Sequence, residues 1–201
     1  MVWRNNRGVY LYFWGSHLVG LPYEAHRMRG PERARVFIVT ISSSRYEAMR
    51  RGGVFSDESG DLAESMLKSM GHEVVGRMLL GDDLLEIRKA IVGLLHRGDV
   101  DVIVTTGGTG VSSSDYTVEA VKPLLDREIE GFGEIFRVVS YQRIGSPAML
   151  SRALTGVARD KLIIVLPGSP DGVRVGLELI GPEIPHILYL IRDHRSSGVP
   201  H

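Results

Sequence analysis

The chain has 201 residues, a hydrophobic fraction of 43% and a formal net charge of zero, which together indicate one globular domain with a substantial core. The balanced charge argues against general binding to nucleic acid or to an acidic membrane surface. The sequence contains no cysteine, which excludes disulfides, thiolate metal sites and cysteine nucleophiles, and only two Asn and one Gln, a depletion that indicates a thermophilic protein.

Residues 1–33 form a predicted N-terminal extension. They carry five Arg and two Glu, and they include the apolar run VYLYFWGSHLVGL at 9–21. This run is too short to span a bilayer and has no small-x-small cleavage site, so it indicates neither a membrane span nor a signal peptide. We expect the extension to pack on the domain or on a neighbouring subunit, and the protein to be cytoplasmic. The predicted domain covers 34–192, and residues 193–201 form a C-terminal tail.

The first half of the domain alternates apolar runs with helical repeats. RVFIVTI at 35–41 is a continuous run of branched residues, as in a strand buried on both faces. Apolar residues then recur at helical spacing from Leu62 to Met70, and Gly71 ends that helix. The predicted elements are a strand (35–41), a polar loop (42–60), a helix (62–70), a strand (72–80), a helix (84–97) and a strand (100–106). This order predicts an open parallel α/β sheet.

The second half repeats the same logic. KLIIVLPG at 161–168 reads as another buried strand that ends in a turn. We predict helical segments over 117–143 with breaks at Pro123 and at the glycines of EGFGE (130–134), a short helix near 147–153, and one or two helices over 171–191.

In such sheets, ligands bind beyond the carboxyl ends of the strands. Three polar loops lie at those ends in the prediction, namely 42–60, 105–116 and 167–171. The turn with Asp82 and Asp83 follows a strand and belongs to the same edge. The sequence therefore collects its unusual residues on one rim of the sheet.

The segment TTGGTGVSSSD at 105–115 has three glycines within four positions, more than a tight turn requires. Its composition indicates a loop that holds an anionic ligand through backbone N–H groups. It lacks the spacing GxGxxG and the ending GK[ST], so it matches neither common phosphate-binding pattern. The alternative is a glycine-rich turn without a ligand.

Two aspartate positions border this rim, and each has two interpretations. Asp115 either holds Mg²⁺ beside bound phosphates or caps the next helix. Of Asp82 and Asp83, we expect one to cap a helix and the other to share the cation. The hydroxyls of SSSRY (42–46) are either phosphate contacts or ordinary loop residues, and LPGSP (166–170) either forms a pocket wall or only ends its strand.

Several motifs in one order now point to a known family. TTGGTG followed by Asp115, then DREIEGFGE (126–134), LSRALTG (150–156) and LPGSP (166–170), resemble the MoaB/Mog family of molybdenum-cofactor biosynthesis proteins. SSSRY and DESG (57–60) resemble its MoaB branch. The resemblance covers about 34–192. It implies a three-layer α/β/α sandwich around a mostly parallel sheet, assembled as trimers or hexamers.

The resemblance also implies an activity. Active members bind molybdopterin, adenylylate its terminal phosphate with Mg-ATP and release pyrophosphate, and a separate metal insertase uses the adenylyl-molybdopterin. The alternative within the family is a non-catalytic molybdopterin carrier.

The family's two acidic positions correspond to Asp82 and Asp115, expected to be catalytic and to hold Mg²⁺. The family often has Arg before the loop aspartate and Pro three residues after it, where this chain has Ser114 and Val118, which removes one phosphate contact. The predicted ligand-binding residues are Ser42, Ser43, Ser44, Thr106, Gly107, Gly108, Thr109, Gly110, Ser140, Ser151, Arg152, Pro167, Gly168 and Ser169.

Overall fold

The computed structural model describes residues 2–4, 10–14, 17–19 and 30–196. Near the N-terminus, β1 (Val2–Arg4), β2 (Tyr10–Trp14) and β3 (His17–Val19) pair as a three-stranded antiparallel sheet. Much of the predicted extension lies outside the described residues, so its packing on the domain or on a neighbour stays a prediction.

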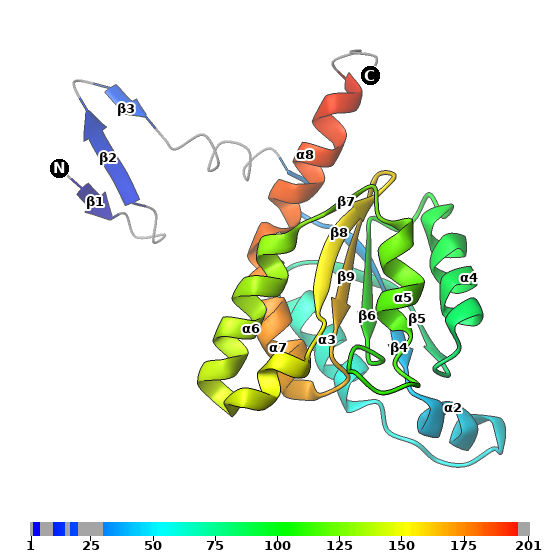
Figure 1. Cartoon of the computed structure of the whole chain (residues 1–201). Helices are drawn as coiled ribbons and strands as arrows, with labels where there is room; N and C mark the ends of the chain where they lie inside the picture. Colours follow the sequence, from blue (N-terminus) through cyan, green and yellow to red (C-terminus); the bar gives the residue numbers. More distant parts are fainter. Residues whose placement is uncertain (1, 5–9, 15–16, 20–29, 197–201) are drawn as a thin grey trace.

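The centre of the domain is a six-stranded sheet with the order β5-β4-β6-β9-β8-β7 (Figure 1). The strands β5, β4, β6 and β9 are parallel, whereas β8 and β7 run antiparallel at one edge. The strand bounds are β4 (Arg35–Ile41), β5 (Glu73–Leu80), β6 (Val102–Thr106), β7 (Arg127–Glu128), β8 (Leu154–Ala158) and β9 (Lys161–Leu166).

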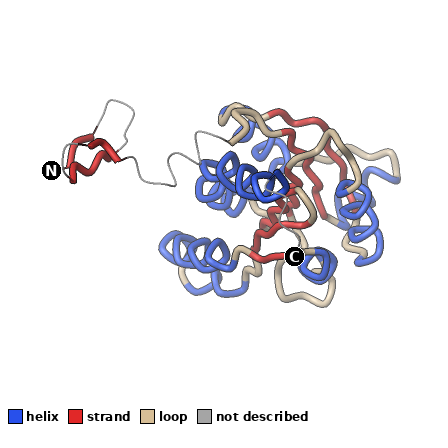
Figure 2. The backbone as a smooth tube through the Cα atoms, turned by 90° about the horizontal axis from the view of Figure 1, so that it is seen from above, coloured by secondary structure: helices blue, strands red, loops and turns tan. Residues whose placement is uncertain are grey.

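Helices cover both faces of this sheet, as the views in Figures 1 and 2 show. On one side lie α3 (Glu58–Ser69), α6 (Glu130–Ile144), α7 (Pro170–Ile180) and α8 (Ile184–Ser196), and on the other α4 (Leu84–Leu95) and α5 (Thr117–Val121). The short helix α2 (Ser43–Arg50) and the 3₁₀ turns η1 (Lys122–Leu124), η2 (Ser146–Leu150) and η3 (Gly181–Glu183) complete the domain. The predicted three-layer sandwich is therefore confirmed.

The continuous apolar strands are explained by these two layers. In β4, Val36 and Ile38 point into the cluster with α3, α7 and α8, while Phe37, Val39 and Ile41 point into the cluster with α4 and α5. Alternate residues of a strand face opposite sides, so a strand covered on both sides has a nearly continuous run of apolar residues.

Three expectations from the sequence were wrong in detail. The predicted loop 42–60 contains α2, which buries none of its residues and so carries no apolar helical repeat. The glycines of EGFGE lie inside the first turn of α6 and do not break it. A Cβ at Gly133 would lie 2.9 Å from Ala153 O, so this glycine allows the helix to pack close to that backbone. Near 147–153, where a short helix was expected, only the 3₁₀ turn η2 forms. The pair β7–β8 was not predicted at all.

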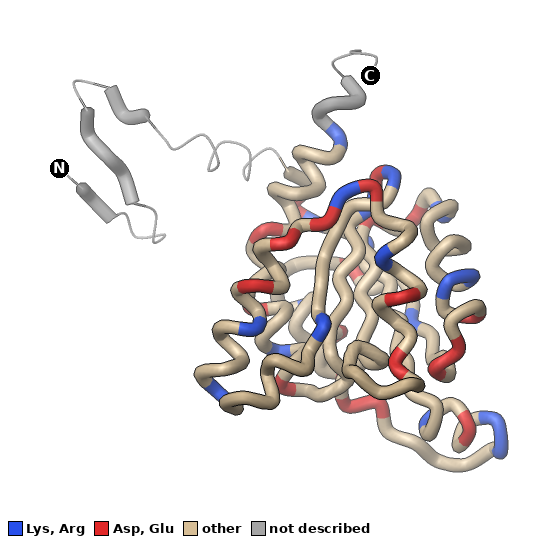
Figure 3. The backbone as a smooth tube through the Cα atoms, in the orientation of Figure 1, with Lys and Arg blue, Asp and Glu red and all other residues tan. Residues whose placement is uncertain are grey.

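None of the described helices is long and apolar enough to cross a membrane. Lys and Arg are interspersed with Asp and Glu over the described part of the backbone (Figure 3). This distribution is consistent with the balanced charge of the sequence.

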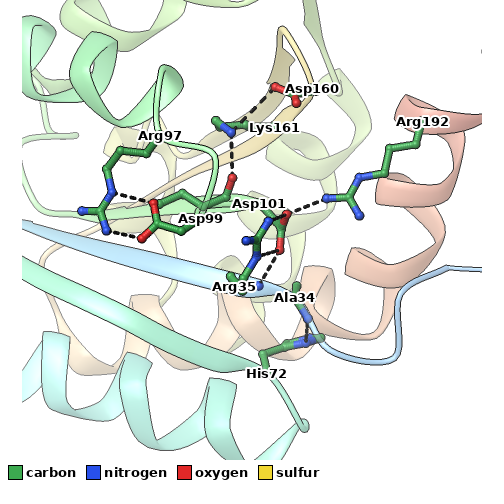
Figure 4. A network of polar contacts seen from close by, with 10 residues as sticks. Ala34, Arg35, His72, Arg97, Asp99, Asp101, Asp160, Lys161 and Arg192 are labelled. Carbon is green, nitrogen blue, oxygen red and sulfur yellow. Dashed lines mark hydrogen bonds and ion pairs between the residues drawn. The ribbon is translucent and has the colours of Figure 1, made fainter. Parts of the chain in front are cut away.

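At the amino-terminal edge of the sheet, Asp101 joins α8 to two strands (Figure 4). The Asp101 carboxylate, 5% exposed, accepts hydrogen bonds from the backbone N–H and guanidinium of Arg35 and from Arg192 at 2.6 Å. Burial alone would raise the pKa of Asp101, but the hydrogen bonds and charge of Arg35 and the charge of Arg192 lower it to about 2. This edge is stabilised by ion pairs and lies opposite the rim with the polar loops.

We predict that Asp101→Asn lowers the free energy of unfolding at pH 7 by about 2 to 3 kcal/mol, the value implied by a pKa near 2 in the folded state and near 4 in the unfolded state. Because the folded-state pKa is lowered, the contribution is complete above about pH 4 and is lost as pH falls towards 2. Denaturant unfolding of both proteins between pH 2 and 7 measures this difference.

Asp99→Asn is the matched control. The pKa of Asp99 is also lowered to about 2, by the hydrogen bond from Arg97, but its side chain is 56% exposed. Solvent screening makes such exposed pairs weak, so this variant should change stability much less. Equal effects of the two variants would contradict the assigned role of the Asp101 network.

Candidate functional site

A cavity of about 440 Å³ opens at the carboxyl edge of the parallel strands. The turns after β6 and β9, the last residue of β4 and the turn before α4 all contribute to its wall. Its lining residues are Ile41, Asp82, Gly107, Gly108, Thr109, Gly110, Asp115, Leu150, Ser151, Pro167, Gly168 and Ser169. The predicted loops 105–116 and 167–171 and the turn with Asp82 thus share one concave site, whereas no residue of the predicted loop 42–60 lines it.

Two glycines of the loop are required by geometry. Gly107 has φ +103°, and a Cβ there would lie 2.1 Å from the carbonyl oxygen of Ile41. Gly108 has φ +64°, and a Cβ there would lie 2.2 Å from Oγ1 of Thr117 and 3.0 Å from Oδ1 of Asp82. Positive φ and the absence of space both exclude larger residues, so these glycines let the loop pass close to β4 and Asp82.

The carbonyl groups of the loop are bound by the protein itself. Thr117 donates from its hydroxyl to Gly107 O at 2.8 Å and from its N–H to Gly108 O at 3.0 Å. Arg152 donates from its backbone N–H to Thr109 O at 3.1 Å and from Nε to Gly110 O at 2.8 Å. All four carbonyls at 107–110 therefore have a donor.

Most N–H groups of the same loop, by contrast, have no acceptor among the described residues. Gly107 N–H donates to Leu166 O at 3.0 Å, but no described residue accepts from the N–H groups of Gly108, Thr109 or Gly110. These residues line the cavity. Consecutive unpaired N–H groups in a concave loop are suited to bind an anion, so the backbone of this loop is a candidate anion site.

The turn after β9 is held against this loop. Gly168 lies beside Gly107, since a Cβ on Gly168 would lie 3.2 Å from the Cα of Gly107. Ser59, fully buried in the first turn of α3, donates from its hydroxyl to Gly168 O at 2.6 Å. Ser169 accepts from Gly172 N–H and caps α7. LPGSP thus forms a wall of the cavity as well as the end of its strand.

The neighbouring residues Asp82 and Asp83 have separate roles. Asp83 accepts from the N–H groups of Leu85 and Glu86 at 2.9 Å and caps α4. Asp82 instead faces the cavity, with Oδ2 accepting from the N–H and hydroxyl of Ser43 at 2.9 and 2.8 Å. The expectation that one of the two caps a helix is confirmed, and the structure assigns that role to Asp83.

Asp115 does not cap α5. The N-cap of α5 is Tyr116, without a side-chain capping bond, whereas Asp115 Oδ2 accepts from Ser112 N–H at 2.8 Å. Asp82 and Asp115 both line the cavity and both have an oxygen, Oδ1, that is outside these bonds. Such oxygens are suitable ligands for a hard cation.

The charge of the cavity wall is negative. No Lys or Arg is among the described residues that line it, although two carboxylates are. No group of three His, Cys, Asp or Glu among the described residues could hold a metal ion. A cation held by Asp82 and Asp115 would therefore take its other ligands from phosphate oxygens and water, as Mg²⁺ usually does.

A second cavity of about 440 Å³ adjoins the first and shares Ser151, Pro167 and Ser169 with it. Its remaining wall is largely apolar and is formed by Phe136, Ser140, Arg143, Ile144, Pro147, Ala148, Asp171, Gly172 and Val175. One half of the combined site is thus lined mainly by polar groups and loop backbone, and the other is a mostly apolar pocket with a few polar groups.

Comparison with known proteins identifies the family. The family model described as "Probable molybdopterin binding domain" matches residues 37–186, most of the chain. The chain belongs to this molybdopterin-binding family. The resemblance seen in the sequence is thereby confirmed.

Individual relatives support the same family assignment. The chain is 44% identical over 166 residues to molybdenum cofactor biosynthesis protein B of Bacillus cereus, covering 82% of this chain and 94% of the relative. It is 36% identical over 174 residues to the molybdopterin adenylyltransferase of Pyrococcus furiosus, covering 85% and 98%. A crystal structure of a molybdenum cofactor biosynthesis protein B superposes with a TM-score of 0.74 at 44% identity, over 81% of this chain and 98% of that one. The chain is a molybdenum-cofactor biosynthesis protein.

Most of the predicted site residues of this family member lie together. The first cavity contains Asp82, Asp115, residues 107–110, Ser151 and residues 167–169. Ser140, 6% exposed, lines only the second cavity. The remaining predicted residues lie outside both walls: Ser42 is the N-cap of α2, Ser43 holds Asp82, Ser44 is exposed, Thr106 is fully buried, and Arg152 contacts the glycine loop.

The apolar part of the wall was not predicted from the sequence. Ile41 and Leu150 line the first cavity, and Phe136, Ile144 and Val175 line the second. Apolar residues on helices are usually core residues, and only the topology shows which of them border a cavity. In the structure Leu150 and Ile144 are distinguished from core residues by their exposure, 54% and 55%.

We predict opposite effects for substitutions of the two neighbouring aspartates. Asp83→Ala removes the cap of α4 and should lower the free energy of unfolding by about 1 kcal/mol. Asp82→Asn keeps an oxygen acceptor for Ser43 and should leave stability nearly unchanged while weakening divalent-cation binding. Chemical unfolding and calorimetric titration with MgCl₂ in the presence of ATP measure the two quantities. A larger loss of stability in Asp82→Asn would contradict this division of roles.

Proposed function

We propose that this protein adenylylates molybdopterin with Mg-ATP and releases pyrophosphate. The observation that carries the proposal is the cavity wall in which loop N–H groups without a protein acceptor lie beside two carboxylates and no basic side chain. Such a wall suits a polyphosphate that arrives with its own cation. The relative named molybdopterin adenylyltransferase is 36% identical over nearly its whole length and supports the same activity.

The two cavities suggest how the substrates divide the site. The phosphates of ATP and of molybdopterin would meet over the glycine loop in the first cavity, where the N–H groups of Gly108, Thr109 and Gly110 are available. The pterin would occupy the second cavity, between Phe136, Ser140 and Val175. Ser151, whose buried hydroxyl has no described partner, lies at the boundary of the two and is suited to a ligand hydrogen bond.

The chemistry requires positioning more than a protein nucleophile. An oxygen of the molybdopterin phosphate attacks the α-phosphorus of ATP, a new P–O bond forms, and the bond between the α-phosphorus and the bridging oxygen to the β-phosphorus breaks. The leaving group is pyrophosphate. The attacking phosphate is already an anion, so no general base is needed. The loop N–H groups would orient the phosphates through bonds that do not have to reorganise during the reaction.

Asp82 and Asp115 are the residues that would hold Mg²⁺. When bound, the ion would offset charge on the α-phosphate and on departing pyrophosphate. Asp82 is fixed by Ser43, and Asp115 by Ser112, so both carboxylates are oriented before a ligand arrives.

The decisive experiment incubates the full chain with molybdopterin, Mg²⁺ and ATP labelled in the α-phosphate. Label should appear in adenylyl-molybdopterin, with one pyrophosphate released per product. Asp82→Asn and Asp115→Asn should lower kcat strongly and change molybdopterin affinity little, because charge stabilisation realised in the transition state affects rate. Tight molybdopterin binding without transfer would refute the adenylylation and leave the carrier function.

We predict that ATP binding depends on a divalent cation. Two carboxylates repel a free polyphosphate, and no basic side chain in the wall offsets them. Affinity for ATP should fall at least about tenfold when EDTA replaces Mg²⁺, and Asp115→Ala should remove most of this dependence. Calorimetry with ATP in each buffer measures it. Equal affinity with and without Mg²⁺ would contradict the cation role of the aspartates.

We also propose that the chain self-associates. The outer face of α6 exposes Ile135, Val138, Tyr141 and Ile144 at a spacing of three residues, each between 55% and 59% exposed. Apolar stripes of this extent usually mark interfaces. The trimeric or hexameric state, a downstream metal insertase that takes the product, and the cytoplasmic location remain predictions.

Light scattering should give a mass that is a multiple of 22.2 kDa and at least twice that of the monomer. The double variant Ile135→Glu/Val138→Glu should shift the mass to that of the monomer, because buried charges without partners are costly at an interface. Leu85→Glu, at a residue 70% exposed on the opposite face of the sheet, is the control and should not change the mass. A monomeric wild type would refute self-association.

A further inference from the structure

Arg152 immediately follows Ser151 of the cavity wall, but its guanidinium binds the backbone of the glycine loop. Nε donates to Gly110 O at 2.8 Å, Nη2 donates to Asp115 O at 3.1 Å, and Nη1 pairs with the carboxylate of Glu119. Its side chain is 32% exposed. All three guanidinium nitrogens therefore have an acceptor from the protein itself.

Two of these acceptors, Gly110 O and Asp115 O, lie at the two ends of the segment 110–115. Asp115 contributes its carboxylate to the cavity, and Gly110 is the last glycine of the anion loop. A Cβ on Gly110 would lie 2.7 Å from Oδ2 of Asp115, so the two ends are already close together. One planar group bound to both carbonyls fixes their relative position, because the N–H groups of a guanidinium diverge in a rigid plane.

Glu119 completes this arrangement from the first turn of α5. Its side chain is 44% exposed, and the hydrogen bond from Arg152 is the main cause that lowers its pKa. The carboxylate occupies the third direction of the guanidinium plane, so rotation of Arg152 towards the cavity would break the ion pair as well as two hydrogen bonds to carbonyls. The pair also cancels the charge of Arg152 beside the anion site.

We propose that Arg152 and Glu119 are positioning residues and that Arg152 does not bind the phosphates. Glu119 sets the plane of the Arg152 guanidinium, and Arg152 holds 110–115 so that the loop N–H groups and the Asp115 carboxylate face the cavity. The effect on nucleotide binding rests on the proposed function, whereas the effect on the ligand-free loop does not.

The first measurement concerns the ligand-free loop. In the full chain labelled with ¹⁵N-glycine, Arg152→Lys and Glu119→Ala should make the amides of Gly108 and Gly110 more mobile by ¹⁵N relaxation. Lysine carries the same charge but cannot donate to two carbonyls and a carboxylate in one plane. Unchanged relaxation of both glycines in both variants would overturn the proposal, whether or not the protein binds ATP.

The control is Glu73→Ala. Glu73 pairs with Arg33 at 3.3 Å, and its side chain is also 44% exposed. It begins β5 at the amino-terminal end of the sheet, so the variant removes an equivalent exposed ion pair and the same charge far along the strands from the loop. It should leave the loop glycines and the ATP affinity as in the wild type.

The second measurement is the affinity for Mg-ATP, and here the sign of the effect decides. If Arg152 holds the loop, Glu119→Ala should weaken binding severalfold and Arg152→Lys about tenfold, as expected for the loss of charge-assisted hydrogen bonds. If Arg152 instead binds phosphate, removing Glu119 would free its charge and tighten binding, and Lys would retain most of the affinity. Tighter binding by Glu119→Ala, or wild-type affinity in Arg152→Lys, would overturn the proposal.

The two measurements also remain informative in two other cases. A wild type that does not bind Mg-ATP refutes the proposed function, and the relaxation measurement still decides the role of Arg152. If Arg152→Lys does not fold, Glu119→Ala and the milder Glu119→Gln, which keeps an oxygen acceptor, provide the test. The order of loss should then be greater for Ala than for Gln, and the reverse order would overturn the proposal.

Discussion

The parallel register of three strands is the constraint on which the site depends. Thr40 of β4 pairs with Thr106 of β6, and Thr106 pairs with Leu166 of β9. The three strands therefore end at the same level, and the residues that follow them emerge side by side. Gly107 then passes against Ile41 O, and Gly168 lies against Gly107. The register of the sheet is therefore enough to bring the turns after β6 and β9 together into one wall.

The orientation of the N–H and carbonyl groups of the loop follows from this register. Leu166 O accepts from Gly107 N–H, and Thr117 and Arg152 bind the carbonyls of 107–110. Because each carbonyl already has a donor, the N–H groups are the polar groups left to face the cavity. The candidate anion site therefore depends on the donors that bind the carbonyls, and these donors belong to Thr117 and Arg152, which are outside the glycine motif itself.

Much of the fold could be predicted because β4, β6 and β9 are buried on both faces and so consist mostly of apolar residues. The missed elements lack this signal. The helix α2 buries no residue, and β8 is short and contains Gly156, where a Cβ would lie 2.6 Å from Arg127 O of β7. A glycine that permits close strand pairing looks, in sequence, like a glycine that interrupts a strand.

The site was partly predictable for a related reason. Glycines and aspartates at strand ends are visible in the sequence, whereas the partners of a side chain are not. Asp82 and Asp83 are adjacent and chemically identical, and only the direction of each carboxylate distinguishes the helix cap from the cavity residue. Arg152 is similar: a basic residue beside a predicted phosphate site suggests a phosphate contact, yet its donors are directed to Gly110, Asp115 and Glu119.

The charge of the site has a consequence for which anions it would accept. Neutral N–H groups attract any phosphate, but Asp82 and Asp115 repel one that carries no cation. Inorganic phosphate, which binds divalent cations weakly, would therefore compete poorly with the polyphosphate of Mg-ATP. A wall with free arginines would bind all of these anions, so the engagement of Arg152 with Glu119 and the loop carbonyls would contribute to selectivity as well as to geometry. The same two carboxylates would thus lower the affinity for free anions and make binding conditional on the cation that the proposed reaction would use.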